Sequence, residues 1–230
     1  MLAASSCSVI LPKQYEYEEE IYLALDGTAT VYVNGSIPAL VALRGLPLDV
    51  KPRALVDRNQ IRALYTSPVT QATRVSTSRR NGRRFVHVRL SVSDIRALQT
   101  AAPFAWSSYM LAQRGGEYVY TQQVGAAART SVGDVGWDGS ELVAFRMHLP
   151  AKIRYHNAPS KQVERGNILA WEQPLKDRLS GTPLTIEVRL DTQSILYRTL
   201  WLFGLMMALV AMLFVAVIWW VVRAGRRSAS

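Results

Sequence analysis

Cysteine and histidine are scarce in this sequence of 230 residues. The single cysteine, Cys7, excludes an internal disulfide framework and any metal site built from several thiolates. His87, His148 and His156 do not have the spacing of metal ligands, so we expect neither a metal nor a cofactor. His87 and His148 each lie in a strand pattern, which is typical of a histidine that faces solvent or is hydrogen-bonded within a sheet.

Recognisable catalytic motifs are also missing. No serine lies in a nucleophile elbow, and no glycine-rich loop ends in Lys-Ser or Lys-Thr. The carboxylates Glu16 and Glu18 to Glu20 alternate with tyrosines or form a run, which indicates a solvated strand face. The two aspartates of Gly133–Gly139 do not match a calcium loop, so we interpret this stretch as a surface loop. The sequence therefore predicts a protein that is not an enzyme.

Charge is absent from the stretch Leu200 to Val222, which also contains no proline and no hydroxyl group. At ~1.5 Å per residue, a helix of this length reaches roughly 34 Å, enough to cross a hydrocarbon core of about 30 Å. The alternative is a buried core helix. The unbroken apolar run close to the chain end favours a single transmembrane helix.

Tryptophans mark the two ends of this run, and arginines lie beyond both ends. Indole rings prefer the headgroup zone of a bilayer, and the excess of arginine after the run, against Arg198 before it, predicts a cytoplasmic C-terminus. The expected membrane-interface residues are Trp201, Trp219, Trp220, Arg223, Arg226 and Arg227. We therefore expect a single-pass protein of a bacterial plasma membrane with its folded domain extracytoplasmic. A tail-anchored protein with a cytoplasmic domain is the alternative.

The formal net charge is +10 at pH 7. A basic balance indicates attraction to anionic lipid, nucleic acid or acidic polymers, without choosing among them. Because the chain carries a membrane anchor, we expect the lipid bilayer as a partner and no nucleic acid.

The N-terminal stretch Met1–Cys7 is too short for a signal peptide, although Ala4-Ser5-Ser6-Cys7 is similar to the end of a lipoprotein signal. One interpretation is that the natural start lies upstream and that Cys7 is the site of lipid attachment. The other is a disordered N-terminus with an incidental thiol.

Short strands and short helices alternate through residues 15–191, which predicts an α+β fold: an antiparallel, β-rich extramembrane domain with a few short helices. Three hairpins are expected, with turns at Asp26-Gly27, Asn81-Gly82 and Arg114–Gly116. Short helices are expected over 37–43, 60–65 and 95–101, the last after a capping box that begins at Ser91. Further strands are expected over 142–149, 153–155, 168–171 and 184–190, and a long loop over 125–140. The remaining segments are an N-terminal segment 1–14, a linker 192–199, the transmembrane helix 200–222 and a basic tail 223–230.

Four arginines are concentrated at the second hairpin. Arg79, Arg80, Arg83 and Arg84 flank Asn81-Gly82, and guanidinium groups bind phosphate in a bidentate manner. Contact with anionic headgroups is one interpretation, and a solvated hairpin that resists aggregation is the other.

Several short motifs resemble those of bacterial lipoproteins of the LppM type. These are Cys7, the early hairpin around Leu25–Val31, the strand Phe145–Pro150, the turn Asn157-Ala158 and the strand Arg165–Trp171. The resemblance implies an envelope protein with a β-rich domain outside the plasma membrane and a C-terminal transmembrane helix. It also implies a binding role toward lipid or glycolipid, and it transfers no catalytic residues.

Three functions remain open from the sequence. The first is a membrane-anchored envelope protein with a binding or structural role, which takes a lipid or glycolipid in an apolar cavity between sheet and helices. The second is an interaction partner or assembly subunit of another membrane protein, because Gly204 and Ala208 give a small-xxx-small spacing. The third is an enzyme with an unrecognised site.

Overall fold

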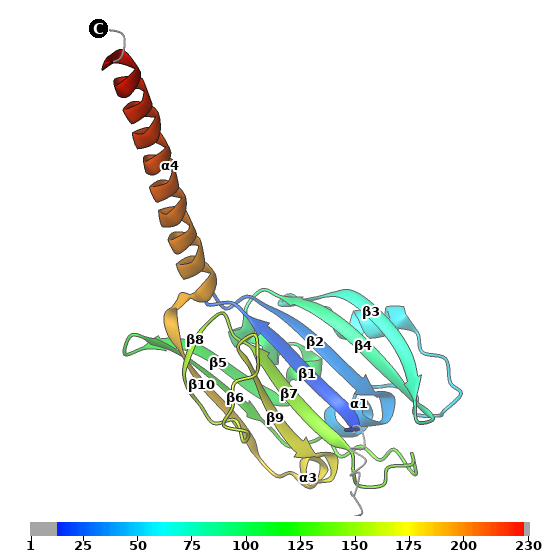
Figure 1. Ribbon diagram of the computed structural model, residues 1–230. Coiled ribbons are helices and arrows are strands. Elements are labelled where there is room, and N and C mark those ends of the chain that lie inside the picture. Colours follow the sequence, from blue (N-terminus) through cyan, green and yellow to red (C-terminus); the bar gives the residue numbers. More distant parts are fainter. Residues whose placement is uncertain (1–12, 228–230) are drawn as a thin grey trace, which may run out of the picture.

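The computed structural model describes residues 13–227, which form two packed β-sheets, several short helices and one long C-terminal helix (Figure 1). Sheet A has the strand order β3-β4-β2-β1-β7-β9, and sheet B has the order β5-β6-β10-β8. The strands of sheet A are β3 (Thr70–Arg80), β4 (Arg83–Val92), β2 (Ala29–Ser36), β1 (Tyr15–Leu23), β7 (Leu142–His148) and β9 (Ile168–Pro174). The strands of sheet B are β5 (Ser107–Arg114), β6 (Glu117–Val124), β10 (Leu184–Ser194) and β8 (Ala151–His156). The predicted α+β fold is confirmed.

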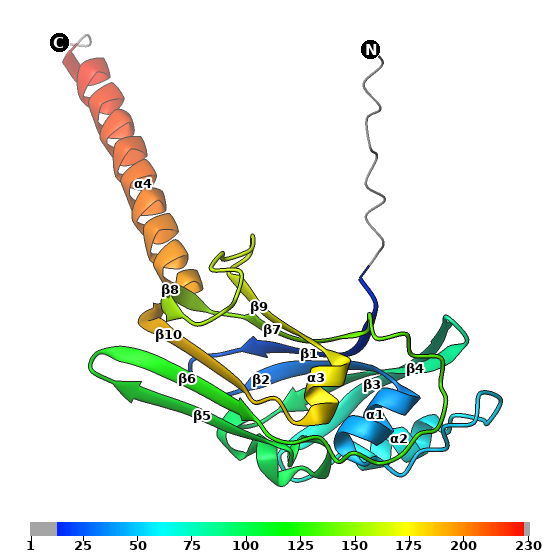
Figure 2. The same cartoon turned by 90° about the horizontal axis from the view of Figure 1, so that it is seen from below.

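Short helices cover the part of sheet A that sheet B leaves open. Figure 2 shows α1 and α2 below β2, β3 and β4, whereas the strands of sheet B lie below the other half of sheet A. The short helices of the domain are α1 (Ile37–Arg44), α2 (Arg58–Leu64), the 3₁₀ helices η1 (Ile95–Thr100) and η2 (Ala102–Phe104), and α3 (Leu175–Ser180), of which η1 contacts β5 and α3 contacts β9 and β7.

Local sequence signals set the boundaries of several elements as expected. The Ser36 hydroxyl accepts a hydrogen bond from the Ala39 amide at 3.1 Å, and Gly45 ends α1 in the left-handed conformation with φ of 66°. Asp57 caps α2 in the same way. Asn81 and Gly82 have φ of 49° and 74°, as a tight two-residue hairpin turn requires.

Three details of the predicted secondary structure are wrong. Asp26-Gly27 lies within a longer loop from Ala24 to Thr28, which the Ala24 amide closes on the Thr28 carbonyl at 2.9 Å. The N-cap of η1 is Asp94, whose side chain accepts from the Arg96 amide, and not Ser91. Finally, an antiparallel arrangement was expected, but β7 pairs with β1 in parallel. These two strands are far apart in the sequence.

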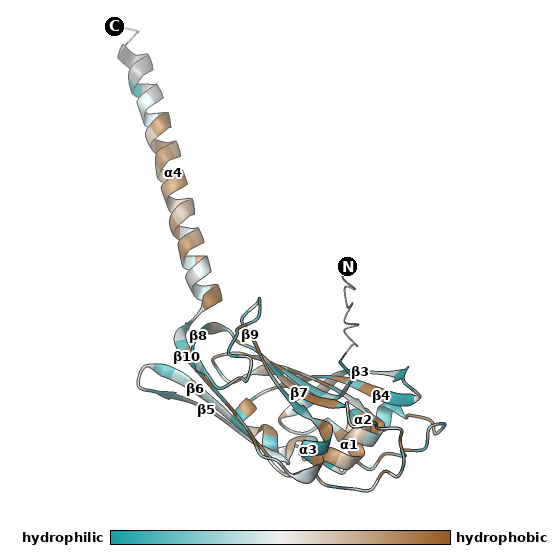
Figure 3. Cartoon of the chain, turned by 60° about the horizontal axis from the view of Figure 1, so that its bottom comes forward, coloured by the Kyte–Doolittle hydropathy of each residue, from teal (hydrophilic) through white to brown (hydrophobic). Residues whose placement is uncertain are grey.

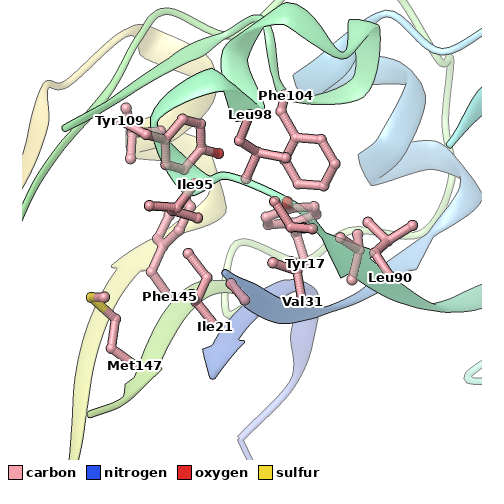
Figure 4. Packing of buried hydrophobic residues seen from close by; sticks show 14 of the residues in the cluster. Tyr17, Ile21, Val31, Leu90, Ile95, Leu98, Phe104, Tyr109, Phe145 and Met147 are labelled. Atoms are coloured by element: carbon pink, nitrogen blue, oxygen red, sulfur yellow. The ribbon is translucent and has the colours of Figure 1, made fainter. Parts of the chain in front are cut away.

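The core lies between the two sheets and under the helices. Tyr17, Ile21 and Phe145 of sheet A pack toward Tyr109 of sheet B and toward Phe104 of η2 (Figure 4). Buried side chains from both sheets and from α1 lie in this space, and an apolar cavity between sheet and helices stays a prediction.

A buried ion pair and its hydrogen bonds join four elements inside this core, namely α1, β1, β5 and β6. Arg44 Nη2 of α1 lies 2.6 Å from Glu19 Oε2 of β1, with side-chain exposures of 1% and 0%. Tyr109 Oη and Gln122 Nε2, both of sheet B, donate to Glu19 Oε1 at 3.1 and 3.0 Å. Burial raises the pKa of Glu19 to about 7, and these two hydrogen bonds oppose the rise. Glu19 was expected on a solvated face, and that expectation is wrong.

Replacing this carboxylate tests its role. We expect Glu19→Gln to destabilise the domain by about 3–5 kcal/mol, because it leaves the Arg44 guanidinium buried without a counter-charge. Denaturant unfolding of the detergent-solubilised chain measures the change. The control is Glu18→Gln, whose partner Arg146 is partly exposed and whose loss is expected to cost about 1 kcal/mol or less. Equal effects of the two substitutions would contradict the assignment.

The C-terminal helix α4 (Ile195–Arg227) projects away from the domain, and Figure 3 colours several of its turns as hydrophobic. The segment Ile195–Trp220 is long and apolar enough to cross a membrane, and its most apolar window is not buried by the rest of the described chain. The helix extends beyond the predicted range 200–222 at both ends. Residues 192–199, the expected linker, are the end of β10 and the beginning of α4.

Candidate functional site

The first turn of α4 follows β10 and lies close to the end of β1 and to the turn after β7, at one end of sheet A. Leu23, Ala29 and Val92 are neighbours in the register of β1, β2 and β4 at this end. The Ile195 amide donates to the Pro150 carbonyl at 2.9 Å, so the first residue of α4 is joined to the β7–β8 turn. We call this end of the domain the anchor end.

An open cleft of about 770 Å³ lies at the anchor end. It is bounded by the β1–β2 loop, the β7–β8 turn and the first residues of α4. Its lining is mainly apolar, and the residues are Leu23, Ala24, Leu25, Asp26, Leu149, Pro150, Gly166, Asn167, Ser194, Ile195 and Leu196. We call this space the anchor-end cleft.

Hydrogen bonds hold the walls of the anchor-end cleft in place. Asp26 Oδ1 accepts from the Thr28 amide at 2.9 Å and from the Thr28 hydroxyl at 2.7 Å, which orders the β1–β2 loop. Across the cleft, Asn167 Nδ2 donates to the carbonyls of Leu149 and Ala151 at 2.8 and 2.6 Å. These hydrogen bonds order the backbone on two sides of the cleft.

A second, more polar hollow of about 520 Å³ adjoins the cleft and shares Leu23, Ala24, Leu149 and Pro150 with it. His148 lines it and stacks on Tyr22, with ring centroids 3.7 Å apart. His148 Nε2 lies 2.5 Å from Glu20 Oε1, so this histidine is hydrogen-bonded within the sheet, as the sequence predicted.

The predicted membrane-interface residues lie along α4. Trp201, Trp219 and Trp220 are exposed, and the Arg223 guanidinium lies 4.9 Å from the centroid of the Trp219 ring. Arg226 and Arg227 belong to the last turn of the same helix. Contact of these six residues with headgroups stays a prediction.

The four hairpin arginines do not act as one exposed cluster. Arg83 and Arg84 are buried, whereas Arg79 and Arg80 are exposed. Arg83 Nη2 lies 3.0 Å from Glu16 Oε1, and its Nη1 donates to the Gly136 carbonyl at 2.7 Å. Headgroup contact therefore stays a prediction that concerns Arg79 and Arg80.

The loop 125–140 returns to the domain at this arginine. Trp137 Nε1 donates to Glu16 Oε2 at 3.3 Å, and Glu141 Oε1 lies 4.0 Å from Arg83 Nη2. Glu16 is 1% exposed, so the expectation of a solvated glutamate is wrong here too. In a regular strand, Glu16 and Glu19 would lie on opposite faces. Both are buried here because the strand register is irregular between Tyr15 and Tyr17.

The expected lipid-attachment residue and possible metal sites were compared with the described part of the chain. Cys7 lies outside residues 13–227. Across those residues, no group of three or more histidine, cysteine, aspartate or glutamate side chains is arranged to hold a metal ion.

The two classes of hairpin arginine should differ in their effect on stability. Arg83→Gln is expected to cost about 3–5 kcal/mol of unfolding free energy, because Glu16 loses its buried partner. Arg79→Gln is expected to cost about 0.5 kcal/mol or less, as for most surface substitutions. Urea denaturation followed by tryptophan fluorescence checks both values. A large cost for Arg79→Gln, or none for Arg83→Gln, would contradict the burial assignment.

Comparison with known proteins yields a similarity of shape. No protein-family model and no curated protein matches the sequence. Among solved structures, the chain is similar to the folded domain of the Mycobacterium tuberculosis LppM protein, determined by NMR. The two are 12% identical, with 81% of this chain and 96% of that chain covered and a TM-score of 0.45. At this level of similarity, function is inferred from the residues of this chain alone.

Proposed function

We propose that this protein is a membrane-tethered protein of the bacterial envelope that binds the apolar part of a lipid or glycolipid in the anchor-end cleft, without catalysis. The observation that carries the proposal is the position of the cleft. Ile195 and Leu196 both line the cleft and begin the helix that is apolar enough to span a membrane.

The position of α4 would bring the cleft to the surface of the bilayer. In a helix that enters lipid near its first turn, the residues just before it lie at the boundary between headgroups and acyl chains. An acyl chain could then pass from the bilayer into the cleft without crossing bulk water. On this route the acyl chain is not exposed to water. Such exposure would cost about 25 cal/mol per Å² of apolar surface.

The size and chemistry of the cleft suit such a ligand. Its volume of about 770 Å³ lies within the roughly 300–1,000 Å³ range of small-molecule sites. Leucine, isoleucine and proline side chains dominate its lining, and Asp26, Asn167 and Ser194 supply the polar rim. The adjoining polar hollow provides room for a headgroup next to the apolar cleft.

A matched pair of substitutions tests lipid binding. Leu25→Asp places a charge in the cleft, and Leu55→Asp makes the same change at a side chain that is 97% exposed. The full-length chain would be reconstituted in nanodiscs that contain a lipid with a photoactivatable group on its acyl chain. We expect cross-links at 23–25, 149–150 and 195–196 in the wild type and in Leu55→Asp, and a loss of about tenfold or more in Leu25→Asp, because burying an unpaired charge is costly.

Labels confined to residues 200–220 in the wild type would contradict lipid entry into the cleft. Native mass spectrometry of the same samples provides a second measurement, because retained lipid should disappear with Leu25→Asp. A stoichiometric protein partner in place of lipid would favour the alternative role as a subunit of a membrane assembly.

The proposal includes an extracytoplasmic domain and a cytoplasmic C-terminus, and protease protection tests this orientation. Protease added to spheroplasts is expected to digest residues 13–194 and to spare a tag fused after Ser230, because the arginines behind α4 favour the cytoplasmic side. Inverted membrane vesicles should give the opposite pattern. Protection of the domain in spheroplasts would instead indicate a domain that faces the cytoplasm.

A further inference from the structure

A basic pocket lies at the end of the domain opposite the anchor end. Its lining includes the tip of the β3–β4 hairpin, the loop before α2 and part of the loop 125–140, and its volume is about 390 Å³. Strand β4 runs from Arg83 at the pocket to Val92 at the anchor end, which separates the two by roughly 30 Å at ~3.3 Å per residue. Figure 1 shows the arrowhead of β3 far from α4. We call this space the distal pocket.

Three cationic side chains belong to the distal pocket or its rim. Lys51 and Arg84 line it, and Arg79 Nη2 donates to the carbonyl of Pro52, another lining residue, at 2.9 Å. Across residues 13–227, none of the three has a carboxylate within 4.0 Å. Their charges are therefore available to an incoming anion.

Arg84 is the central group because it is 7% exposed and is held by neutral acceptors. Its Nη1 donates to the Ala54 carbonyl at 2.5 Å, and its Nη2 donates to the Asp49 carbonyl. A guanidinium has five N–H donors, so other donors remain. Desolvation, together with the nearby charge of Arg79, lowers the pKa of Arg84, and the Asp49 carboxylate opposes this shift only in part. An anion at this point would add a second negative charge beside Arg84.

The other charged groups nearby leave the pocket positive. Arg83 also lines it, but Glu16 neutralises this arginine at 3.0 Å. Asp134 is the acidic residue in the lining, and its carboxylate accepts a hydrogen bond from the Gly136 amide at 3.0 Å. The Asp49 carboxylate also acts on Arg84, and it accepts a hydrogen bond from the Lys51 amide at 2.9 Å. Three cations against these two carboxylates leave a positive balance that favours an anion.

We propose that the distal pocket binds a phosphate group presented by a soluble or polymeric molecule, and not by the bilayer that holds α4. Arginine offers a planar fork that matches phosphate oxygens, and lysine adds a point charge. The separation of roughly 30 Å along β4 from the anchor end is the reason for proposing a phosphate source other than that bilayer. This site is independent of the anchor-end cleft.

Pyrophosphate binding to the full-length chain in phosphatidylcholine nanodiscs tests the proposal by calorimetry at 0.15 M salt. We expect saturable binding that Lys51→Gln/Arg79→Gln weakens by about tenfold or more, because charge-assisted hydrogen bonds are lost. The control Arg62→Gln/Arg74→Gln removes two exposed arginines and changes the net charge equally, and should alter the affinity by about twofold or less. Circular dichroism verifies that each variant remains folded.

Absence of binding to the wild type, or an equal loss in the control, would overturn the site. Nanodiscs that contain phosphatidylglycerol distinguish the source of the phosphate. At this salt concentration the Debye length is about 8 Å, so the lipid charge is screened over the distance to the pocket. Unchanged pyrophosphate affinity supports a ligand outside the bilayer, whereas competition by the anionic lipid would overturn that part of the proposal.

Discussion

The uncovered apolar surface of α4 is the constraint on which the arrangement of the molecule depends. In residues 13–227 nothing packs against the most apolar window of this helix, so its side chains require lipid or another chain. Because α4 continues directly from β10 and is bonded to the β7–β8 turn, its environment also determines the environment of one end of sheet A. The domain therefore has an anchor end and a distal end, and each has a pocket of different chemistry.

Buried charge is the second organising feature, and β1 is its source. Glu16 and Glu19 lie on the same strand, yet each is balanced by an arginine from a different part of the chain. The Glu19 carboxylate joins β1 to α1 and to sheet B, whereas Glu16 joins β1 to the β3–β4 hairpin and, through Trp137, to the long loop. A buried carboxylate is costly without such partners, so these contacts restrict how the layers can pack.

Local features of the fold were predictable because a few adjacent residues specify them. Ser36 and Gly45 bound α1, and Asn81-Gly82 turns the β3–β4 hairpin, through interactions within a few positions. The parallel pairing of β1 with β7 and the inward orientation of Glu19 were missed. Both depend on partners far along the chain, such as Gln122 for Glu19, and a run of glutamates carries no local signal for burial.

Composition and local pattern alone determined that the chain ends in a helix suited to a membrane and that the preceding domain is α+β. Solvation and turn geometry act within short stretches, so the sequence displays them directly. Only the tertiary structure decided which arginines of one hairpin are exposed, where the anchor-end cleft opens and which cations share the distal pocket. Those outcomes depend on residues that are distant in sequence, as Arg83 and Glu16 are, and that meet only when the sheet assembles.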